Sequence, residues 1–321
     1  MDKLICGWLC LTVCGAMACQ VVAEDRFFAY DSPSQTLVVV ELETGMVTPI
    51  GEVNAPVGFI SDLAVVGEKL YGLEVSYAPP NTTAWLVELS VHCGEILSRV
   101  AISHEGSTTF NGAMEGLSRS AEGSPPDSPL AVAFNIGGVG PSYSNAIGEL
   151  ALDGTLTNVA SYIGVLDADG FTVAASGGGY FAVDNDPQSN FTILHIDDGV
   201  TALGSPFAGQ VRNSDGMVDS GDWLYCIDRT TDEIHRLDRT TAAAVESFPF
   251  ESGYTLNAIE LFIEGKVIGD LTCDGAIDVS DLLVLLASWG SCGDINDCPA
   301  DLDGDGSVDV SDLLMLLANW G

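Results

Sequence analysis

The feature that most constrains the fold is a phrase of four short strands that recurs along residues 26–263. Short apolar runs alternate there with glycine-rich turns, and few stretches have the spacing of an amphipathic helix. Four copies follow one another, at residues 60–102, 110–163, 168–206 and 214–249. A fifth copy is split between the two ends, because 255–262 supplies its first strand and 26–53 supplies the other three.

A four-stranded unit that repeats every 40–60 residues or so is typical of a β-propeller. We therefore predict a mainly β fold, with a five-bladed β-propeller over residues 24–265. A last blade shared by both chain ends would close the ring and remove exposed sheet edges. An irregular β-sandwich is the alternative interpretation of the same pattern.

Alignment of the five first strands, which should be the innermost ones, places one polar residue at the same position of each copy. These residues are Ser61, Glu115, Asp169, Asp215 and Asn257. Innermost strands line the central channel, so the alignment predicts a ring of oxygen-bearing side chains near one channel mouth. Such a ring would hold a divalent metal or orient a polar ligand. The competing interpretation is that Asp and Asn simply begin strands after tight turns.

Two of these first strands contain the phrases MEGLS (114–118) and SDGMVD (214–219). They resemble phrases of the gluconolactonase-like propeller family, which has six blades. The resemblance implies that Glu115 and Asp215 bind a divalent metal that polarises a lactone. The sequence has no G-x-S-x-G motif, and its histidines are expected on turns or outer strands, so no catalytic triad is predicted. The histidines are His92, His104, His195 and His235.

Two acidic segments of twelve residues follow, DLTCDGAIDVSD (270–281) and DLDGDGSVDVSD (301–312). Ca²⁺ takes about six to eight oxygen ligands, and a twelve-residue loop supplies them from positions 1, 3, 5, 7, 9 and 12. The sixth residue is glycine in both, where the chain must turn sharply. The predicted ligands are Asp270, Thr272, Asp274, the carbonyl of Ala276, Asp278 and Asp281, then Asp301, Asp303, Asp305, the carbonyl of Ser307, Asp309 and Asp312. A pair of acidic surface turns is the alternative.

Each loop runs into an apolar helix, VSDLLVLLASWG or VSDLLMLLANWG, and the eighth loop residues Ile277 and Val308 are placed to pair the loops back to back. These loop–helix units resemble the dockerin domain of bacterial secreted polysaccharide-degrading systems. The resemblance implies a domain over residues 266–321, two Ca²⁺ ions and a cohesin-like protein partner. At the family's recognition positions this chain carries Val279, Ser280, Val310 and Ser311, and then Leu286, Ala287, Leu317 and Ala318 instead of a basic pair.

These helices are apolar nearly all round, although a helix of a two-helix module should bury only one stripe. The surplus apolar surface must therefore be covered by the propeller, by a second copy or by a docking partner.

The formal net charge of −36, with only ten Lys and Arg, argues against binding to nucleic acid or to anionic membranes. Residues 1–23 have the pattern of a signal peptide, with a lipid anchor at Cys19 as the alternative, and no membrane span is expected. In an oxidising compartment we expect one disulfide among Cys273, Cys292 and Cys298.

The sequence thus predicts a secreted or extracytoplasmic protein, in which a calcium-loaded module docks to another protein and the propeller binds carbohydrate or protein. The alternative function is enzymatic, with a polysaccharide-degrading glycoside hydrolase or a metal-dependent lactonase in the propeller.

Overall fold

The computed structural model describes residues 22–67, 69–78, 81–110, 112–121, 127–136, 144–163, 168–175, 178–184, 192–196, 200–204, 216–263, 269–272, 276–292, 298–302 and 306–320. Residues 1–21 of the predicted signal peptide therefore lie outside the described residues. So do Asp215, Asp274, Asp303, Asp305 and Cys273, as well as the side chains of Glu115 and Asp169.

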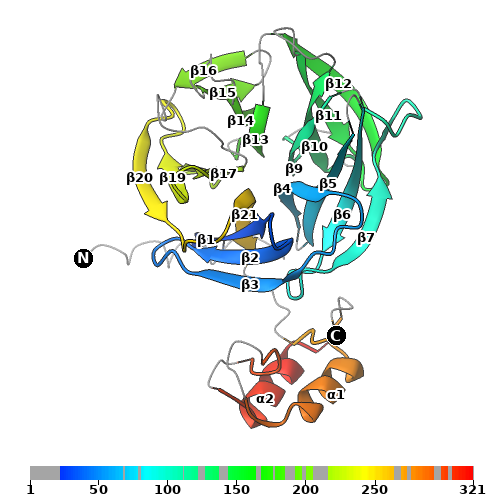
Figure 1. Cartoon of the computed structure of the whole chain (residues 1–321), viewed down its shortest axis with the longest axis vertical. Helices are drawn as coiled ribbons and strands as arrows, with labels where there is room; N and C mark the ends of the chain where they lie inside the picture. The colour runs from blue at the N-terminus through cyan, green and yellow to red at the C-terminus, as the bar shows by residue number, and fades with distance from the viewer. Residues whose placement is uncertain are drawn as a thin grey trace, which may run out of the picture.

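Most of the chain forms five antiparallel sheets arranged as blades around a central axis (Figure 1). Blade 1 contains β4 (Phe59–Val66), β5 (Lys69–Ala78), β6 (Asn81–Leu89) and β7 (Ile96–Ala101). Blade 2 contains β9 (Met114–Arg119), β10 (Leu130–Ile136), β11 (Ser144–Leu150) and β12 (Thr155–Ile163), with the short β8 (Ser103–His104) parallel to β12. Blade 3 contains β13 (Ala168–Val173), β14 (Tyr180–Asp184), β15 (Thr192–Ile196) and β16 (Val200–Gly204). Blade 4 contains β17 (Met217–Asp219), β18 (Leu224–Asp228), β19 (Glu233–Leu237) and β20 (Ala244–Pro249).

Blade 5 is built from both ends of the propeller segment. It contains β21 (Leu256–Ile263), β1 (Val22–Asp31), β2 (Thr36–Glu41) and β3 (Val47–Glu52), in that order across the sheet. The innermost strands β4, β9, β13, β17 and β21 contact one another in a closed ring. The predicted five-bladed propeller and its shared last blade are therefore confirmed, and the β-sandwich alternative is wrong.

The core consists of five buried hydrophobic clusters, each shared by two neighbouring blades. The aromatic rings of Phe27 in blade 5 and Tyr225 in blade 4, for example, lie 4.9 Å apart. Packing between blades requires small residues where two inner strands approach. A Cβ added at Gly116 would lie 2.4 Å from the Cβ of Phe171 in the next blade, closer than real Cβ contacts come. This close approach explains why a small residue, Gly or Ala, stands before an apolar residue in most of the innermost strands, as in Gly116-Leu117.

Polar side chains of the inner strands also join neighbouring blades. Asp62 in β4 is fully buried, and its Oδ2 accepts a hydrogen bond from the backbone N–H of Leu117 in β9 at 2.8 Å. Ser118 Oγ accepts one from Val173 N in β13 at 2.7 Å. Equivalent bonds run from Asp219 N to Thr172 Oγ1 and from Val65 N to Glu260 Oε2. Inner strands have no ladder partner on their channel side, so these bonds satisfy backbone N–H groups that a buried strand cannot leave unpaired.

The C-terminal part contains two helices, α1 (Val279–Ala287) and α2 (Val310–Ala318), which contact each other (Figure 1). Its small core is formed by Ile277, Leu285, Ala300, Val308 and Leu316. The two-residue strands β22 (Gly290–Ser291) and β23 (Ser307–Val308) pair antiparallel. Ile277 and Val308, the eighth residues of the two loops, both enter this core, while the strand partner of Val308 is Gly290 in the chain leaving α1.

A disulfide joins Cys292 to Cys298, which confirms one bond among the three clustered cysteines and identifies the pair. None of the helices in the described residues is long and apolar enough to cross a membrane.

Candidate functional site

The predicted channel positions coincide with β-bulges of the innermost strands. Ser61, Glu115 and Asn257 are each the extra residue at a register shift between the first and second strands of their blades. In β13 the shift lies between Asp169 and Phe171, next to the predicted position. A bulge turns a side chain out of the regular alternation, and bulges are frequent beside active sites. Among the described residues, four of the five innermost strands therefore carry a bulge at or beside the aligned position, which the sequence alignment alone did not reveal.

Asn257 and Ser61 are the two channel residues whose side chains are described, and they lie on the adjacent inner strands β21 and β4. Both are buried, with 7% and 8% of their surface exposed. Ser61 Oγ donates a hydrogen bond to the carbonyl of Leu73 at 3.2 Å. Asn257 Oδ1 is buried and has no hydrogen-bond partner among the described residues. A buried acceptor without a donor costs about 1–3 kcal/mol, and a bound cation or hydroxyl group would remove that cost.

More polar groups gather in the same seam between blades 5 and 1. Glu74 is fully buried and pairs with Arg99, whose Nε lies 2.5 Å from Glu74 Oε2. Burial raises the pKa of the Tyr30 hydroxyl, and the negative charges of Asp31 and Glu74 raise it further. Asp31 Oδ1 accepts a hydrogen bond from Thr255 N at 2.7 Å. Several oxygen-bearing side chains are therefore buried together between the apolar residues of blades 5 and 1.

Apolar side chains are exposed at the rim of this seam. Val57 lies just before β4, Phe59 is its first residue and Tyr77 is near the end of β5; they are exposed by 51%, 40% and 58%. They lie at the same end of blade 1 as Ser61, because β4 and β5 run antiparallel. Flat apolar rings beside a few fixed polar groups are typical of small-molecule binding sites.

Glu260 lies three residues beyond Asn257 on the innermost strand β21. Burial raises its pKa to about 7, although hydrogen bonds from Leu261 N and Val65 N and the charge of Arg119 act in the opposite direction. Nothing in the sequence pattern singles out Glu260, because its hydrogen bond to Val65 N depends on contact with the neighbouring blade.

In the C-terminal module, the position-twelve aspartates organise both predicted calcium loops. Asp281 and Asp312 are fully buried. Asp281 Oδ1 accepts hydrogen bonds from Thr272 N at 2.9 Å and Thr272 Oγ1 at 3.0 Å, while Oδ2 accepts one from Asp278 N at 2.8 Å. Loop positions 3, 9 and 12 therefore meet at one point. Burial opposes ionisation of Asp281, but these hydrogen bonds outweigh it and hold its pKa below the ordinary value.

The second loop has a similar arrangement, with positions 2, 9 and 12 joined. Asp312 Oδ1 accepts from Leu302 N at 2.6 Å, and Oδ2 accepts from Asp309 N at 2.7 Å. Asp278 and Asp309 are also the N-caps of α1 and α2, so each loop passes into its helix through a capping box. Among the other predicted ligands, Asp270 is buried, Ala276 is exposed, and Asp301 and Ser307 are half-buried.

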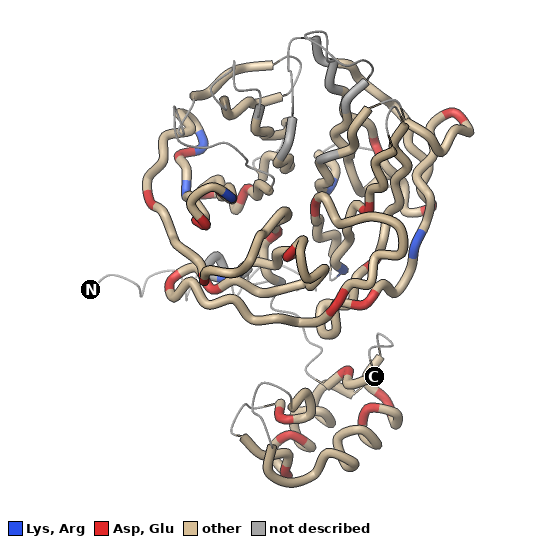
Figure 2. Tube along the Cα trace, in the orientation of Figure 1, with Lys and Arg blue, Asp and Glu red and all other residues tan. Residues whose placement is uncertain are grey.

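The donor set of the loops fits Ca²⁺. All side-chain donors are hard oxygen atoms, which suit this ion. Residues 270–321 contain eleven aspartates and no Lys or Arg that could neutralise them. Figure 2 shows this contrast along the trace, with acidic residues in the module and no basic ones among its described residues.

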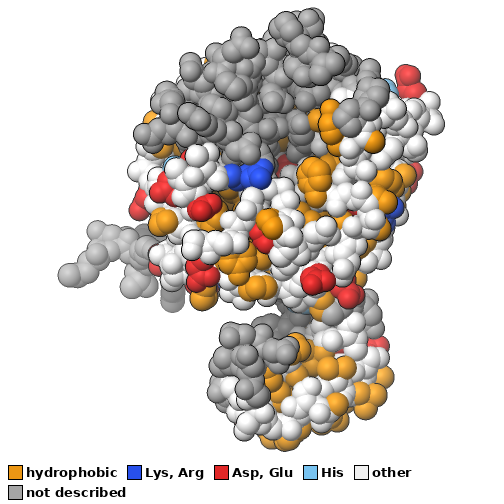
Figure 3. Space-filling model, in the orientation of Figure 1, with side chains coloured by type: hydrophobic (Ala, Val, Ile, Leu, Met, Phe, Trp, Pro, Cys, Tyr) orange, Lys and Arg blue, Asp and Glu red, His pale blue; other side chains and the backbone are white. Residues whose placement is uncertain are grey.

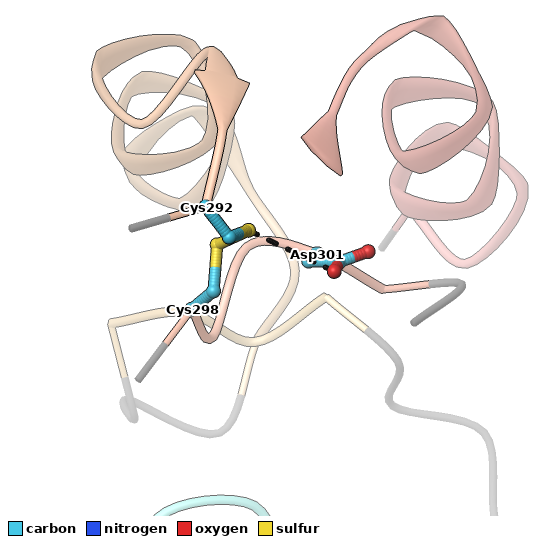
Figure 4. A group of neighbouring side chains, drawn as sticks. All are labelled: Cys292, Cys298 and Asp301. Atoms are coloured by element: carbon cyan, nitrogen blue, oxygen red, sulfur yellow. Dashed lines mark hydrogen bonds between the residues drawn. A yellow bond between two sulfur atoms is a disulfide. The ribbon is translucent and has the colours of Figure 1, made fainter. Parts of the chain in front are cut away.

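The disulfide between Cys292 and Cys298 lies beside the second loop (Figure 4). Cys292 Sγ is 3.7 Å from Asp301 Oδ2, the side chain at loop position one. Because both sulfur atoms are in the disulfide, they offer no thiolate to a metal, and this group is a brace rather than a metal site. Cys93 in blade 1 is also disulfide-bonded, which the sequence spacing did not predict. Its Sγ lies 4.0 Å from the carbonyl oxygen of Asp270, and its bonding partner is outside the described residues.

Both helices and the residues just beyond their ends expose apolar side chains at equivalent positions. The exposed residues are Val279, Leu283, Leu286 and Trp289 after the first loop, and Val310, Leu314, Leu317 and Trp320 after the second. We call this set the paired apolar face, and Figure 3 shows hydrophobic side chains gathered over the module. Leu285 and Leu316 are fully buried in the module core instead. The propeller therefore does not cover the surplus apolar surface, which corrects one of the three alternatives drawn from the sequence.

No family model and no curated protein match the chain. Solved structures with a similar fold include a chain of a nidogen/laminin complex, at 14% identity and a TM-score of 0.43, covering 74% of this chain and 97% of that one. Hydrazine synthase from Kuenenia stuttgartiensis matches at 11% identity and a TM-score of 0.41, covering 74% and 95%. A putative 6-phosphogluconolactonase from Bacteroides uniformis matches at 14% identity and a TM-score of 0.36, covering 71% and 68%. These values say nothing about activity, and the five-bladed fold rests on the strand order of the chain itself.

Proposed function

We propose that this is a secreted calcium-binding protein whose C-terminal segment, residues 266–321, is a dockerin-like module that attaches the propeller to another extracellular protein. The observation that carries this proposal is the paired apolar face. Eight exposed apolar side chains occupy equivalent places on the two helices and just beyond their ends, directly after the acidic loops. An isolated exposed leucine is ordinary, but a contiguous apolar face of this kind marks an interaction site.

Two Ca²⁺ ions would be held by the aspartates, the Thr272 hydroxyl and the Ala276 and Ser307 carbonyls named above. The ions supply positive charge at the centre of each loop and thereby fix the start of each helix. The chain's own contribution is to collect loop positions 3, 9 and 12 around a buried aspartate. Metal binding to such loops contributes directly to the free energy of folding, so docking should require calcium.

The partner should be a cohesin-like or other extracellular protein with an apolar patch. Interface cores are depleted of charge, and Leu286 and Leu317 stand where a dockerin would carry its basic pair. Apolar contact therefore replaces charge at these places. The partner's rim should be basic, since the module carries eleven aspartates and only two divalent ions to balance them.

For the propeller, we propose carbohydrate binding at the mouth near Asn257 and Ser61. The unpartnered Asn257 Oδ1 would accept a hydrogen bond from a sugar hydroxyl, and the exposed Phe59 and Tyr77 would lie against the apolar face of the ring. A second candidate is a hydrolase of the glycoside hydrolase or lactonase type, with one divalent metal at the same mouth. Two carboxylate residues of the column, Glu115 at a bulge and Asp169 beside one, favour that candidate.

A calcium-dependent capture experiment tests the proposal. The full chain is immobilised and exposed to proteins and glycans secreted by the source organism, in calcium and in chelator. We expect one protein to be retained only with calcium and a glycan to be retained in both conditions. Substitution Asn257→Leu should remove the glycan and leave the protein bound. Capture of the protein in chelator would refute the docking function, and turnover of the glycan in place of retention would favour the hydrolase.

A further inference from the structure

Three neighbouring strands of blade 4 bring together a serine, a histidine and an aspartate. Ser247 is on β20, His235 on β19 and Asp228 on β18 (Figure 1 shows β19 beside β20). The strand register places His235 directly opposite Ser247, and Asp228 opposite Glu233. Sequence analysis predicted no such group, because only the hairpin register aligns residues that are 7 and 12 positions apart.

The side chains form a chain of polar contacts. Ser247 Oγ and His235 Nδ1 are hydrogen-bonded at 3.0 Å. The other ring nitrogen, Nε2, lies 3.6 Å from Asp228 Oδ2 and 3.7 Å from Glu233 Oε2. Asp228 is itself held in place, since Oδ1 accepts from Thr230 N at 2.8 Å and Oδ2 from Thr231 Oγ1 at 2.9 Å.

Burial decreases along this chain from the acid to the nucleophile. Asp228 is 1% exposed, His235 is 8% exposed and Ser247 is exposed. This order is the one that nucleophilic catalysis requires, because the carboxylate must be shielded from water and the hydroxyl must reach a substrate. A hydrogen bond from Ser247 alone would satisfy one nitrogen of the buried His235 ring. The ordered Asp228 carboxylate near the other nitrogen is the additional feature that a catalytic arrangement requires.

We propose that Ser247 is an activated nucleophile that cleaves carboxylic esters, with His235 as general base and Asp228 as the residue that orients the ring. Ser247 Oγ attacks the ester carbonyl carbon while its proton passes to His235 Nδ1. The carbon–alkoxide bond then breaks, and the alkoxide takes that proton and leaves as an alcohol. Water hydrolyses the acyl-serine by the same transfers and releases the carboxylic acid.

The strand edge beside Ser247 supplies hydrogen-bond donors for the oxyanion. β20 is the outermost strand of its sheet, and no strand of the described residues pairs with its outer side. An antiparallel edge strand directs alternate backbone N–H groups outward, so one donor lies within a residue of Ser247. Such a donor can stabilise the negative oxygen of the tetrahedral intermediate.

Labelling with a fluorophosphonate tests the proposal, because this reagent reacts with activated serines. The full calcium-loaded protein should incorporate one label per chain, which peptide mapping should locate at Ser247. Ser247→Ala should remove the label. His235→Gln should slow labelling by about 100-fold or more, the usual loss when a general base is removed. Hydrolysis of 4-nitrophenyl acetate should fall in parallel.

Two matched variants separate catalysis from structure. Ser98 is exposed on β7, the outermost strand of blade 1, so Ser98→Ala is a control that should change nothing. Asp228→Asn should slow labelling more than Glu233→Gln does, if Asp228 orients the ring. Absence of label at Ser247 in the wild-type protein overturns the proposal, whatever the variants do. Equal labelling rates in wild type and His235→Gln, at equal melting temperature, overturn it as well.

Discussion

Leu286 and Leu317 provide the sharpest test of the paired apolar face, because each directly follows a buried leucine of the module core. Leu286 and Leu317 are 48% and 47% exposed, whereas Leu285 and Leu316 are fully buried. The perturbation is the double substitution Leu286→Lys and Leu317→Lys in the full chain. Since the two leucines occupy equivalent positions, both loop–helix units are altered in the same way.

The magnitude follows from these exposures. Full burial of a leucine side chain stabilises by about 1.5–3 kcal/mol, so covering the exposed half contributes about 0.8–1.5 kcal/mol for each. Loss of both should weaken partner binding by about 1.5–3 kcal/mol, or about 10- to 150-fold. Stability should change by no more than about 0.5 kcal/mol, since exposed substitutions rarely do more. In a module of this size that corresponds to about 2–4 °C in melting temperature.

The assay combines titration calorimetry against the captured partner with scanning calorimetry in calcium. Leu285→Ala with Leu316→Ala is the matched control, and it should cost about 2–5 kcal/mol per site in module stability. A docking role for the paired apolar face is refuted if the double lysine variant binds the partner as well as wild type does. It is also refuted if that variant loses as much stability as the core control.

Three further predictions concern calcium, pH and the seams between blades. Chelation of calcium should unfold the C-terminal module, because its eleven aspartates then repel one another, and should leave the propeller folded. Circular dichroism measures both signals, and a helical module that still melts cooperatively in chelator would contradict this prediction. Because burial raises the pKa of Glu260 from 4.5 to about 7, the stability it contributes is present below pH 4.5 and is lost as pH rises through 7. Glu260→Gln should therefore gain stability relative to wild type between pH 4.5 and 7. A difference in unfolding free energy between the two proteins that stays the same at all pH values would contradict this prediction. Asp62→Ala should destabilise by about 1–3 kcal/mol in urea unfolding, since Leu117 N loses its buried acceptor, and a change below about 0.5 kcal/mol would show that the bond between blades is dispensable.

Local interactions explain what could be predicted for the C-terminal module. Each capping box joins residues three apart, as Asp278 and Asp281 do, and each loop closes within twelve residues. The spacing of aspartate and glycine is therefore enough to predict where both helices begin. It is not enough to predict that β23 pairs with β22, because that choice depends on where the chain returns after α1.

In the propeller, too, local sequence determined some features and contacts between strands determined others. The sequence by itself determined the number of blades and the shared fifth sheet, because every blade is one local meander of apolar runs and turns whose pattern repeats. Only the tertiary structure decided which leucine of each helix is buried, that bulges fall at Ser61 and Asn257, and that Ser247, His235 and Asp228 meet. The physical reason is that register and packing depend on contacts between strands, and a single residue of slip would turn any of these side chains to the other face.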